Sequence, residues 1–285
     1  MLKYRLLFGT LMTVFFTGLV ILDGWLDGSI TACQADDKPL QGTLLCVLIS
    51  VLLVPAQLEL SKLVSARDLK LFVPISLVAS ILLATCWYWP GLIEISLVIY
   101  VPLVLAFTLV ALLLYQYVNF GLSGVVANCG ANCFSILYLG LFSAFVLAVR
   151  LDFGPWPLLM FVFVVKSADI GAYTVGMLFG KHKFSPKISP GKTWEGMAGA
   201  VVLAVIVAFF FAAVFDIMVW PLAVVFGFCF AFIGQIGDLV ESMIKRDARQ
   251  KDSADNVPGF GGILDVIDSP LIAAPFAYLF FMFCN

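Results

Sequence analysis

The feature that most constrains this chain of 285 residues is a series of apolar runs, each long enough to cross a lipid bilayer. About 20 helical residues span the hydrocarbon core, and lipid offers no partner to an unpaired backbone group, so each run is predicted to be a helix. Hydrophobic residues make up 62% of the chain and charged residues 12%, which is more apolar surface than a soluble fold can bury. The sequence therefore predicts an all-α polytopic membrane protein with about nine transmembrane helices, near residues 4–22, 40–60, 70–89, 92–115, 132–149, 156–180, 196–215, 218–238 and 263–284.

Basic residues between the runs predict the orientation, because short loops rich in Lys and Arg stay in the cytoplasm. Lys3 and Arg5 place the amino terminus there. The first run lacks an A-x-A-like cleavage site, so it is interpreted as a retained helix rather than a signal peptide. With nine crossings the other basic loops fall inside. The first outside loop carries four aspartates against a single lysine, and the later outside loops add three charged residues: Asp23, Asp27, Asp36, Asp37 and Lys38, then Arg150, Asp152 and Asp216.

Charge and cysteine content exclude two classes of protein. A net charge of -2 argues against a nucleic-acid partner, and seven cysteines, nearly all inside apolar runs, do not form a secreted disulfide framework. The segments 166–195 and 238–268 hold 18 of the 34 charged residues. We therefore expect residues 1–150 to be a scaffold of transmembrane helices, and residues 151–285 to hold the catalytic helices and cytoplasmic substrate loops.

Acidic residues enter the apolar runs of the second half. The last purely apolar stretch, Leu271–Cys284, is too short to cross a bilayer, so its helix must begin earlier and include Asp265 and Asp268. The eighth run leads directly into Asp238 and Glu241. Converging carboxylates repel one another, and hard oxygen ligands suit Mg²⁺. The sequence thus predicts a divalent metal site near the ends of these two helices.

Spacing supports this convergence. Four residues that stand at i, i+3, i+4 and i+7 share one helical face: Asp238, Glu241, Ser242 and Lys245. The alternative is that these are interfacial charges that cap helix ends in water. Lys166 and Asp169 also lie inside an apolar run, and for Lys166 we favour an ion pair with Asp169 that stabilises the helix.

The polar loop Gly180–Lys192 reads GKHKFSPKISPGK and is followed by Thr193 and Glu195 at a predicted helix start. Lysines beside free backbone N–H groups at a helix start favour phosphate binding. A P-loop is excluded, because Pro186 stands where that motif needs glycine. His182, the only histidine, is interpreted as a solvated loop residue.

Two segments resemble the phosphatidate cytidylyltransferase (CDP-diacylglycerol synthase) family. In the segment 242–268, SMIKRDARQKDSADNVPGFGGILDVID, the family signature is matched at Ser242, Lys245, Arg246, Lys251, Asp252, Pro258, Gly259, Gly261, Gly262, Leu264, Asp265 and Asp268. A second block is matched at Asp169, Gly171, Ala172, Tyr173, Gly176, Gly180, Lys181, Ser189, Pro190, Lys192, Thr193, Glu195 and Gly196. Two positions depart from the pattern: Phe260 replaces the usual histidine, and Val266 replaces the usual arginine.

The resemblance implies transfer of CMP from CTP to phosphatidate, which gives CDP-diacylglycerol and pyrophosphate for phospholipid synthesis. It implies catalytic roles for Asp238, Asp265, Asp268 and Lys245, with Mg²⁺ held by Asp238 and Asp265 and a second cation left open. Substrate contacts are expected from Ser189, Lys192, Thr193, Glu195, Ser242, Arg246, Lys251, Asp252 and Asp169. Because the carboxylates and lysines are intact, we expect the histidine missing at 260 not to be essential.

Two alternatives stay open at this stage. One is a cytidylyltransferase for another lipid phosphate, of the CDP-archaeol type. The other is an ion-coupled secondary transporter, since intramembrane charges also mark ion pathways, although the halves show no inverted repeat. The expected setting is the bacterial inner membrane with the active site facing the cytoplasm, and a homodimer is compatible with the sequence.

Overall fold

The computed structural model describes residues 2–30, 40–250, 253–254 and 261–284. Within these ranges the regular elements are helices, and an isolated β-bridge joins Lys183 to Thr193. The elements are α1 (Leu2–Asp27), α2 (Thr43–Ser65), α3 (Val73–Ala84), α4 (Pro90–Ile93), α5 (Leu97–Phe120), α6 (Val125–Ser135), the π-helical turn η2 (Ile136–Leu141), α7 (Phe142–Phe153), α8 (Pro155–Phe179), α9 (Trp194–Phe215), α10 (Trp220–Asp247) and α11 (Leu264–Cys284).

All nine predicted apolar runs contain a helix, which confirms an all-α polytopic membrane protein. In the described part of the chain, eight helical segments are long and apolar enough to cross a membrane, with α6, η2 and α7 forming one of them. The run at 70–89 is helical only over the 12 residues of α3, because Pro74 sets its first turn and residues 85–89 form turns before Pro90. The count of nine crossings therefore stays a prediction.

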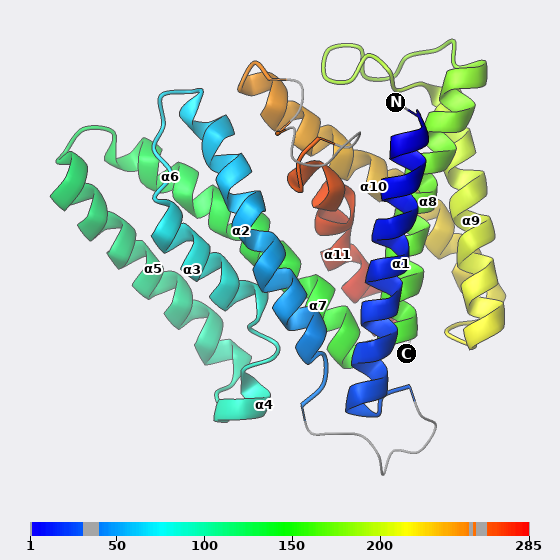
Figure 1. The fold of residues 1–285 in the computed structure, drawn as a ribbon, viewed down its shortest axis with the longest axis horizontal. Coiled ribbons are helices and arrows are strands. Elements are labelled where there is room, and N and C mark those ends of the chain that lie inside the picture. Colours follow the sequence, from blue (N-terminus) through cyan, green and yellow to red (C-terminus); the bar gives the residue numbers. More distant parts are fainter. Residues whose placement is uncertain (1, 31–39, 251–252, 255–260, 285) are drawn as a thin grey trace.

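The helices form a bundle in which the loops of interest share one side. Figure 1 shows that the α8–α9 loop, the end of α10 and the start of α11 lie on the same side as the α2–α3 connection. Two contacts support this view: Arg67 pairs with Asp247 at 3.1 Å, and the Arg246 Nε donates to the carbonyl of Ile188 at 3.3 Å. The end of α1, the start of α2 and the end of α7 lie on the opposite side (Figure 1).

Helices α8 and α9 pack closely because glycines face one another. A Cβ on Gly171 of α8 would overlap the backbone carbonyl of Gly199 on α9 and lie 3.1 Å from the Ala200 Cα. A Cβ on Gly176 would likewise lie 3.2 Å from the hydroxyl oxygen of Thr193, the N-cap residue of α9. Backbones can approach this closely only where a side chain is absent, and the close approach fixes the α8–α9 loop relative to both helices.

One predicted helix boundary is wrong. Arg150, which the predicted run 132–149 left in a loop, is fully buried in α7, which continues to Phe153. Its guanidinium lies 3.1 Å from Asp23 Oδ2 and 2.7 Å from Asp27 Oδ2, and it donates to Ser29 Oγ at 2.9 Å. A buried charge persists only when it is paired and hydrogen-bonded, so α1 and α7 are held together at this end of the bundle.

Candidate functional site

Three carboxylates converge where α10 and α11 meet. Asp238, Glu241 and Asp268 each place an oxygen within 4.8 Å of the others, and among the described residues they form the group that could hold a metal ion. We call them the acidic cluster. Helix α10 carries the first two because it runs for 28 residues and continues well past the apolar run. Glu241 and Asp268 are buried, and Asp238 is half-buried.

Lys245 links the acidic cluster to Asp265. Its Nζ lies 2.6 Å from Glu241 Oε2, one turn earlier on α10, and 2.7 Å from Asp265 Oδ1 on α11. The other oxygen of Asp265 accepts the Gly262 N–H at 2.7 Å and the Ser253 N–H at 3.3 Å. The carboxylate of Asp265 therefore orients Lys245 and closes the turn before α11.

This arrangement differs from the predicted metal pair. The sequence-based expectation joined Asp238 with Asp265, whereas the structure groups Asp238 with Glu241 and Asp268. Residues 265 and 268 are three apart on α11, so their side chains point about 60° apart around the helix. The rotation of α11 turns Asp268 toward Asp238 and leaves Asp265 facing Lys245 and the backbone of the preceding turn.

Lys192 reaches the acidic cluster from the α8–α9 loop. Its Nζ lies 2.7 Å from Asp238 Oδ2 and donates to the Gln235 carbonyl at 2.9 Å. Backbone bonds across the loop, from Phe184 N–H to the Lys192 carbonyl and from Trp194 N–H to the His182 carbonyl, hold it in a narrow hairpin-like form. The loop thus delivers an ammonium group to a site made by other helices.

Asp169 and Lys166 of α8 complete this face of the site. Lys166 Nζ lies 3.6 Å from Asp169 Oδ2 and 4.0 Å from Asp268 Oδ1, so the expected ion pair within α8 is present and extends to α11. Gln235 of α10 donates to Asp169 Oδ1 at 3.0 Å. Six predicted residues therefore lie in one connected network with Glu241: Asp169, Lys192, Asp238, Lys245, Asp265 and Asp268.

The remaining predicted residues lie around this network. Thr193 caps α9, its hydroxyl accepting the Gly196 N–H at 3.1 Å. Glu195 accepts the N–H groups of Lys181 and His182 at 3.1 Å each and pairs with the His182 ring at 2.6 Å, so it shapes the loop rather than facing the acidic cluster.

Ser189 closes a turn of the α8–α9 loop by accepting the Lys192 N–H on its carbonyl, and Arg246 touches the same loop. Ser242 lies 3.5 Å from Asp238 Oδ1, a long contact. Lys251, Asp252 and Phe260 lie outside the described residues, while Val266 belongs to α11.

Two residues of the amino-terminal half also belong to the site and were not predicted. Glu59 of α2 accepts the N–H groups of Ile263 and Leu264 at 3.0 and 2.9 Å. Tyr138 sits in the π-helical turn η2, close enough to Asp268, Glu241 and Asp265 to interact with them electrostatically. A carboxylate inside an apolar run is a signal that could have identified Glu59; nothing in the sequence around Tyr138 does so.

The donor set fits a divalent cation. Glu241 Oε1 and the Tyr138 hydroxyl are buried and have no hydrogen-bond partner in the described part of the protein. The ion pairs connect five carboxylates to three lysines, which leaves a formal excess of two negative charges among these residues. Hard oxygen ligands with uncompensated charge are what Mg²⁺ prefers.

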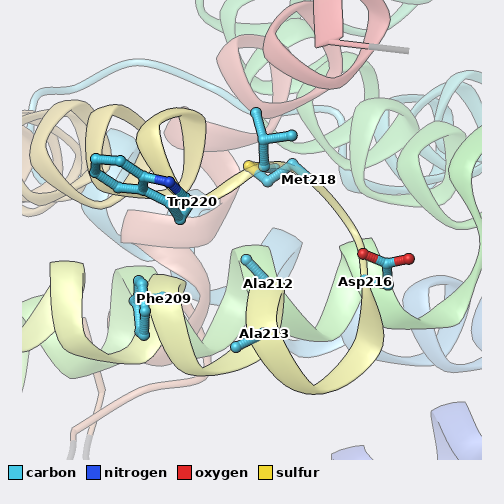
Figure 2. Close-up of a pocket in the computed structure, with 7 residues that line it drawn as sticks. Phe209, Ala212, Ala213, Asp216, Met218 and Trp220 are labelled. Carbon is cyan, nitrogen blue, oxygen red and sulfur yellow. The ribbon is translucent and has the colours of Figure 1, made fainter.

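A pocket elsewhere on the protein lacks these features. It has a volume of about 210 Å³ and lies at the turn between α9 and α10. Figure 2 shows Phe209 and Trp220 toward one end of this pocket and Asp216 at the other. The turn lies on the side of the bundle opposite the end of α10 and the start of α11 (Figure 1), so this pocket is not part of the site.

Sequence comparison with known proteins agrees with the two motif segments described above. Over 132 residues the chain is 42% identical to the phosphatidate cytidylyltransferase of Haemophilus influenzae, an alignment that covers 44% of this chain and 46% of that protein. It is 45% identical over 116 residues to the phosphatidate cytidylyltransferase of Bacillus subtilis, covering 40% and 43%. With that of Mycobacterium bovis it shares 37% over 157 residues, covering 54% and 51%.

The chain thus matches about half the length of these curated relatives. The family model extends further and matches residues 39–284, which include every residue of the acidic cluster and the amino-terminal contributors Glu59 and Tyr138. The chain belongs to the cytidylyltransferase family.

Proposed function

We propose that this membrane protein transfers CMP from CTP to phosphatidate and releases CDP-diacylglycerol and pyrophosphate. The observation that carries the proposal is the network of the acidic cluster with Lys166, Lys192 and Lys245, built from segments that the family model covers. The names of the relatives favour phosphatidate as acceptor. A transporter is disfavoured because the ion-paired network of five carboxylates and three lysines comes entirely from residues 166–268, with no matching network of charges from the amino-terminal half in the described residues.

In this reaction an oxygen of the phosphatidate phosphate attacks the α-phosphorus of CTP, and the bond from that phosphorus to the β-phosphate oxygen breaks. The phosphate monoester is largely ionised near neutral pH, since its second pKa is about 6, so the step needs no strong general base. The pyrophosphate leaves as an anion. The chain must therefore align two anionic reactants and balance their charge.

The residues of the site suit that task. Lys192 and Lys245 are held by carboxylates at the edge of the acidic cluster, so their ammonium groups stand ready to exchange a carboxylate partner for a phosphate oxygen. We assign Mg²⁺ binding to Asp238, Glu241 and Asp268; when bound, the ion would neutralise phosphate oxygens and polarise the reacting phosphorus. Asp265 orients Lys245 in this scheme.

We propose that the site faces the cytoplasm of a bacterial inner membrane. The basic segments around Arg67, Lys192 and Arg246 lie on one side of the bundle, joined by the contacts of Arg67 and Arg246 (Figure 1). Basic residues concentrate on the cytoplasmic side. That side supplies CTP from water, and phosphatidate can enter from the bilayer.

The test is formation of labelled lipid by the purified full chain in detergent with phosphatidate, Mg²⁺ and CTP labelled at the α-phosphate. We expect chloroform-soluble label and one pyrophosphate per labelled lipid. Asp238→Asn should abolish formation of labelled lipid and of pyrophosphate. Asp216→Asn should leave both unchanged, because Asp216 is exposed and lies at the opposite side of the bundle. Absence of labelled lipid from folded wild type would refute the proposal; label only with an ether-lipid phosphate would reassign the acceptor.

A further inference from the structure

The start of α11 has no capping side chain of its own. The carbonyl of Ile263 accepts the Ile267 N–H at 3.1 Å, which makes Ile263 the N-cap residue by position. An isoleucine side chain cannot accept the N–H groups that a helix leaves unpaired in its first turn. These groups need an acceptor from elsewhere, because Gly262 and Leu264 are buried and Ile263 between them is half-buried.

Glu59 of α2 supplies that acceptor from a distant part of the chain. Its Oε1 accepts the Ile263 N–H at 3.0 Å and its Oε2 accepts the Leu264 N–H at 2.9 Å, across more than 200 residues of sequence. The Glu59 side chain is buried, with 1% of the residue exposed. A negative charge at a helix start also interacts favourably with the helix dipole.

Ser253 and Gly262 both lie against the Glu59 carboxylate. The Ser253 hydroxyl lies 3.1 Å from both Glu59 Oε2 and Asp265 Oδ2, and its one proton can bond either of them. A Cβ on Gly262 would overlap the Ser253 Oγ and approach the Glu59 Cδ to 2.7 Å. Glycine at 262 thus allows the backbone to lie against the Glu59 carboxylate.

We propose that Glu59 is a positioning residue of the active site, which fixes the start of α11 and thereby the orientation of Asp265 and Lys245. Asp265 follows Leu264 directly, and its carboxylate holds the Lys245 ammonium at 2.7 Å. Lys245 in turn contacts Glu241 of the acidic cluster at 2.6 Å. The kinetic part of this inference rests on the proposed function; the anchoring of α11 does not.

Glu59→Gln is the sharpest test, because it preserves size and removes one acceptor. The new NH₂ group must face an N–H of Ile263 or Leu264, so at least one cap bond is lost. We expect the amides of residues 263–268 to exchange with deuterium about tenfold faster, since one net hydrogen bond corresponds to roughly that factor. In turnover, kcat should fall at least about tenfold while the KM for CTP changes by less than about threefold.

Glu94→Gln is the matched control, since Glu94 is exposed and follows α4 at the other side of the bundle; both measurements should match wild type. Glu59→Asp is the second variant: it keeps the charge, but its shorter side chain cannot keep both N–H groups at bonding distance, so exchange of residues 263–268 should again be several-fold faster. If Glu59→Gln does not fold, Glu59→Asp decides the anchoring.

Unchanged exchange of residues 263–268 in the folded variants would overturn the inference. Faster exchange with an unchanged kcat would overturn it too, as would a rise in the KM for CTP with no fall in kcat. A wild type without turnover would refute the proposed function, and exchange would still decide whether Glu59 anchors α11.

Discussion

Replacing Lys245 by Met removes the cation that connects α10 with α11. In the structure its ammonium lies 2.6 Å from Glu241 Oε2 and 2.7 Å from Asp265 Oδ1. The side chains of Lys245, Glu241 and Asp265 are 12%, 1% and 8% exposed. Methionine fills a similar volume without a charge, so the substitution leaves two buried carboxylates without their cation and creates little cavity.

The magnitude follows from what each carboxylate retains. Removing one partner of a buried ion pair costs about 3–5 kcal/mol, because the other charge stays buried and unpaired. Asp265 keeps the N–H groups of Gly262 and Ser253, whereas Glu241 Oε1 has no hydrogen-bond partner in the described residues. We therefore expect a loss of about 3 kcal/mol in the free energy of unfolding. Glu241→Gln added to Lys245→Met should recover at least about 1 kcal/mol, since the pair is coupled.

The assay is unfolding in mixed micelles of increasing SDS content, without Mg²⁺, followed through labelling of the fully buried thiol of Cys86. Lys62→Met, at an exposed lysine near the end of α2, is the matched control and should change the free energy of unfolding by less than about 0.5 kcal/mol. A loss below about 1 kcal/mol for Lys245→Met, or a double variant no more stable than the single one, would refute the reasoning.

Three further changes test other parts of the structure. Asp268→Asn should abolish the stabilisation that bound Mg²⁺ gives to the wild type, which is about 2.7 kcal/mol at a Mg²⁺ concentration a hundred times the Kd. If Mg²⁺ raises the thermal unfolding temperature of the variant and of the wild type equally, Asp268 is not a metal ligand. Lys192→Ala should raise the KM for CTP or phosphatidate, or lower kcat, by at least about tenfold through loss of a phosphate contact, and unchanged steady-state kinetics would make the loop a basic connector. Gly171→Ala should cost about 1–3 kcal/mol by separating α8 from α9, whereas Gly191→Ala, where a Cβ meets open space, should leave thermal unfolding unchanged.

The helices were largely predictable because the bilayer imposes a length on each apolar run. That length requirement can be read from local composition alone, and each of the nine apolar runs that it identifies contains a helix. It could not show that the third run yields a helix of only 12 residues, since prolines at 74 and 90 act on backbone geometry and not on hydropathy. It also left open that α10 continues to Asp247, because the last turns of this helix are polar.

The site was predictable where it depends on one helix. The i, i+4 spacing of Glu241 and Lys245 already implied their contact, which the structure shows at 2.6 Å. The choice between Asp265 and Asp268 as neighbour of Asp238 depends on how α11 is rotated about its axis. Packing against α10 and the contacts at the start of α11 set that rotation, and no spacing within α11 encodes it.

Charges in apolar surroundings carry a different kind of information. A carboxylate inside a transmembrane run predicts that a partner exists, since an unpaired charge there is too costly. The identity of the partner lies beyond local sequence: Asp23 and Asp27 meet Arg150 more than 120 residues away, and Glu59 meets a helix start more than 200 residues away. The first contact joins α1 to α7 within the predicted scaffold of residues 1–150, whereas the second joins α2 to the start of α11. Glu59 therefore binds α2 to the site by buried polar contacts, which explains why a helix with weak motif resemblance still holds a residue on which the geometry of α11 depends.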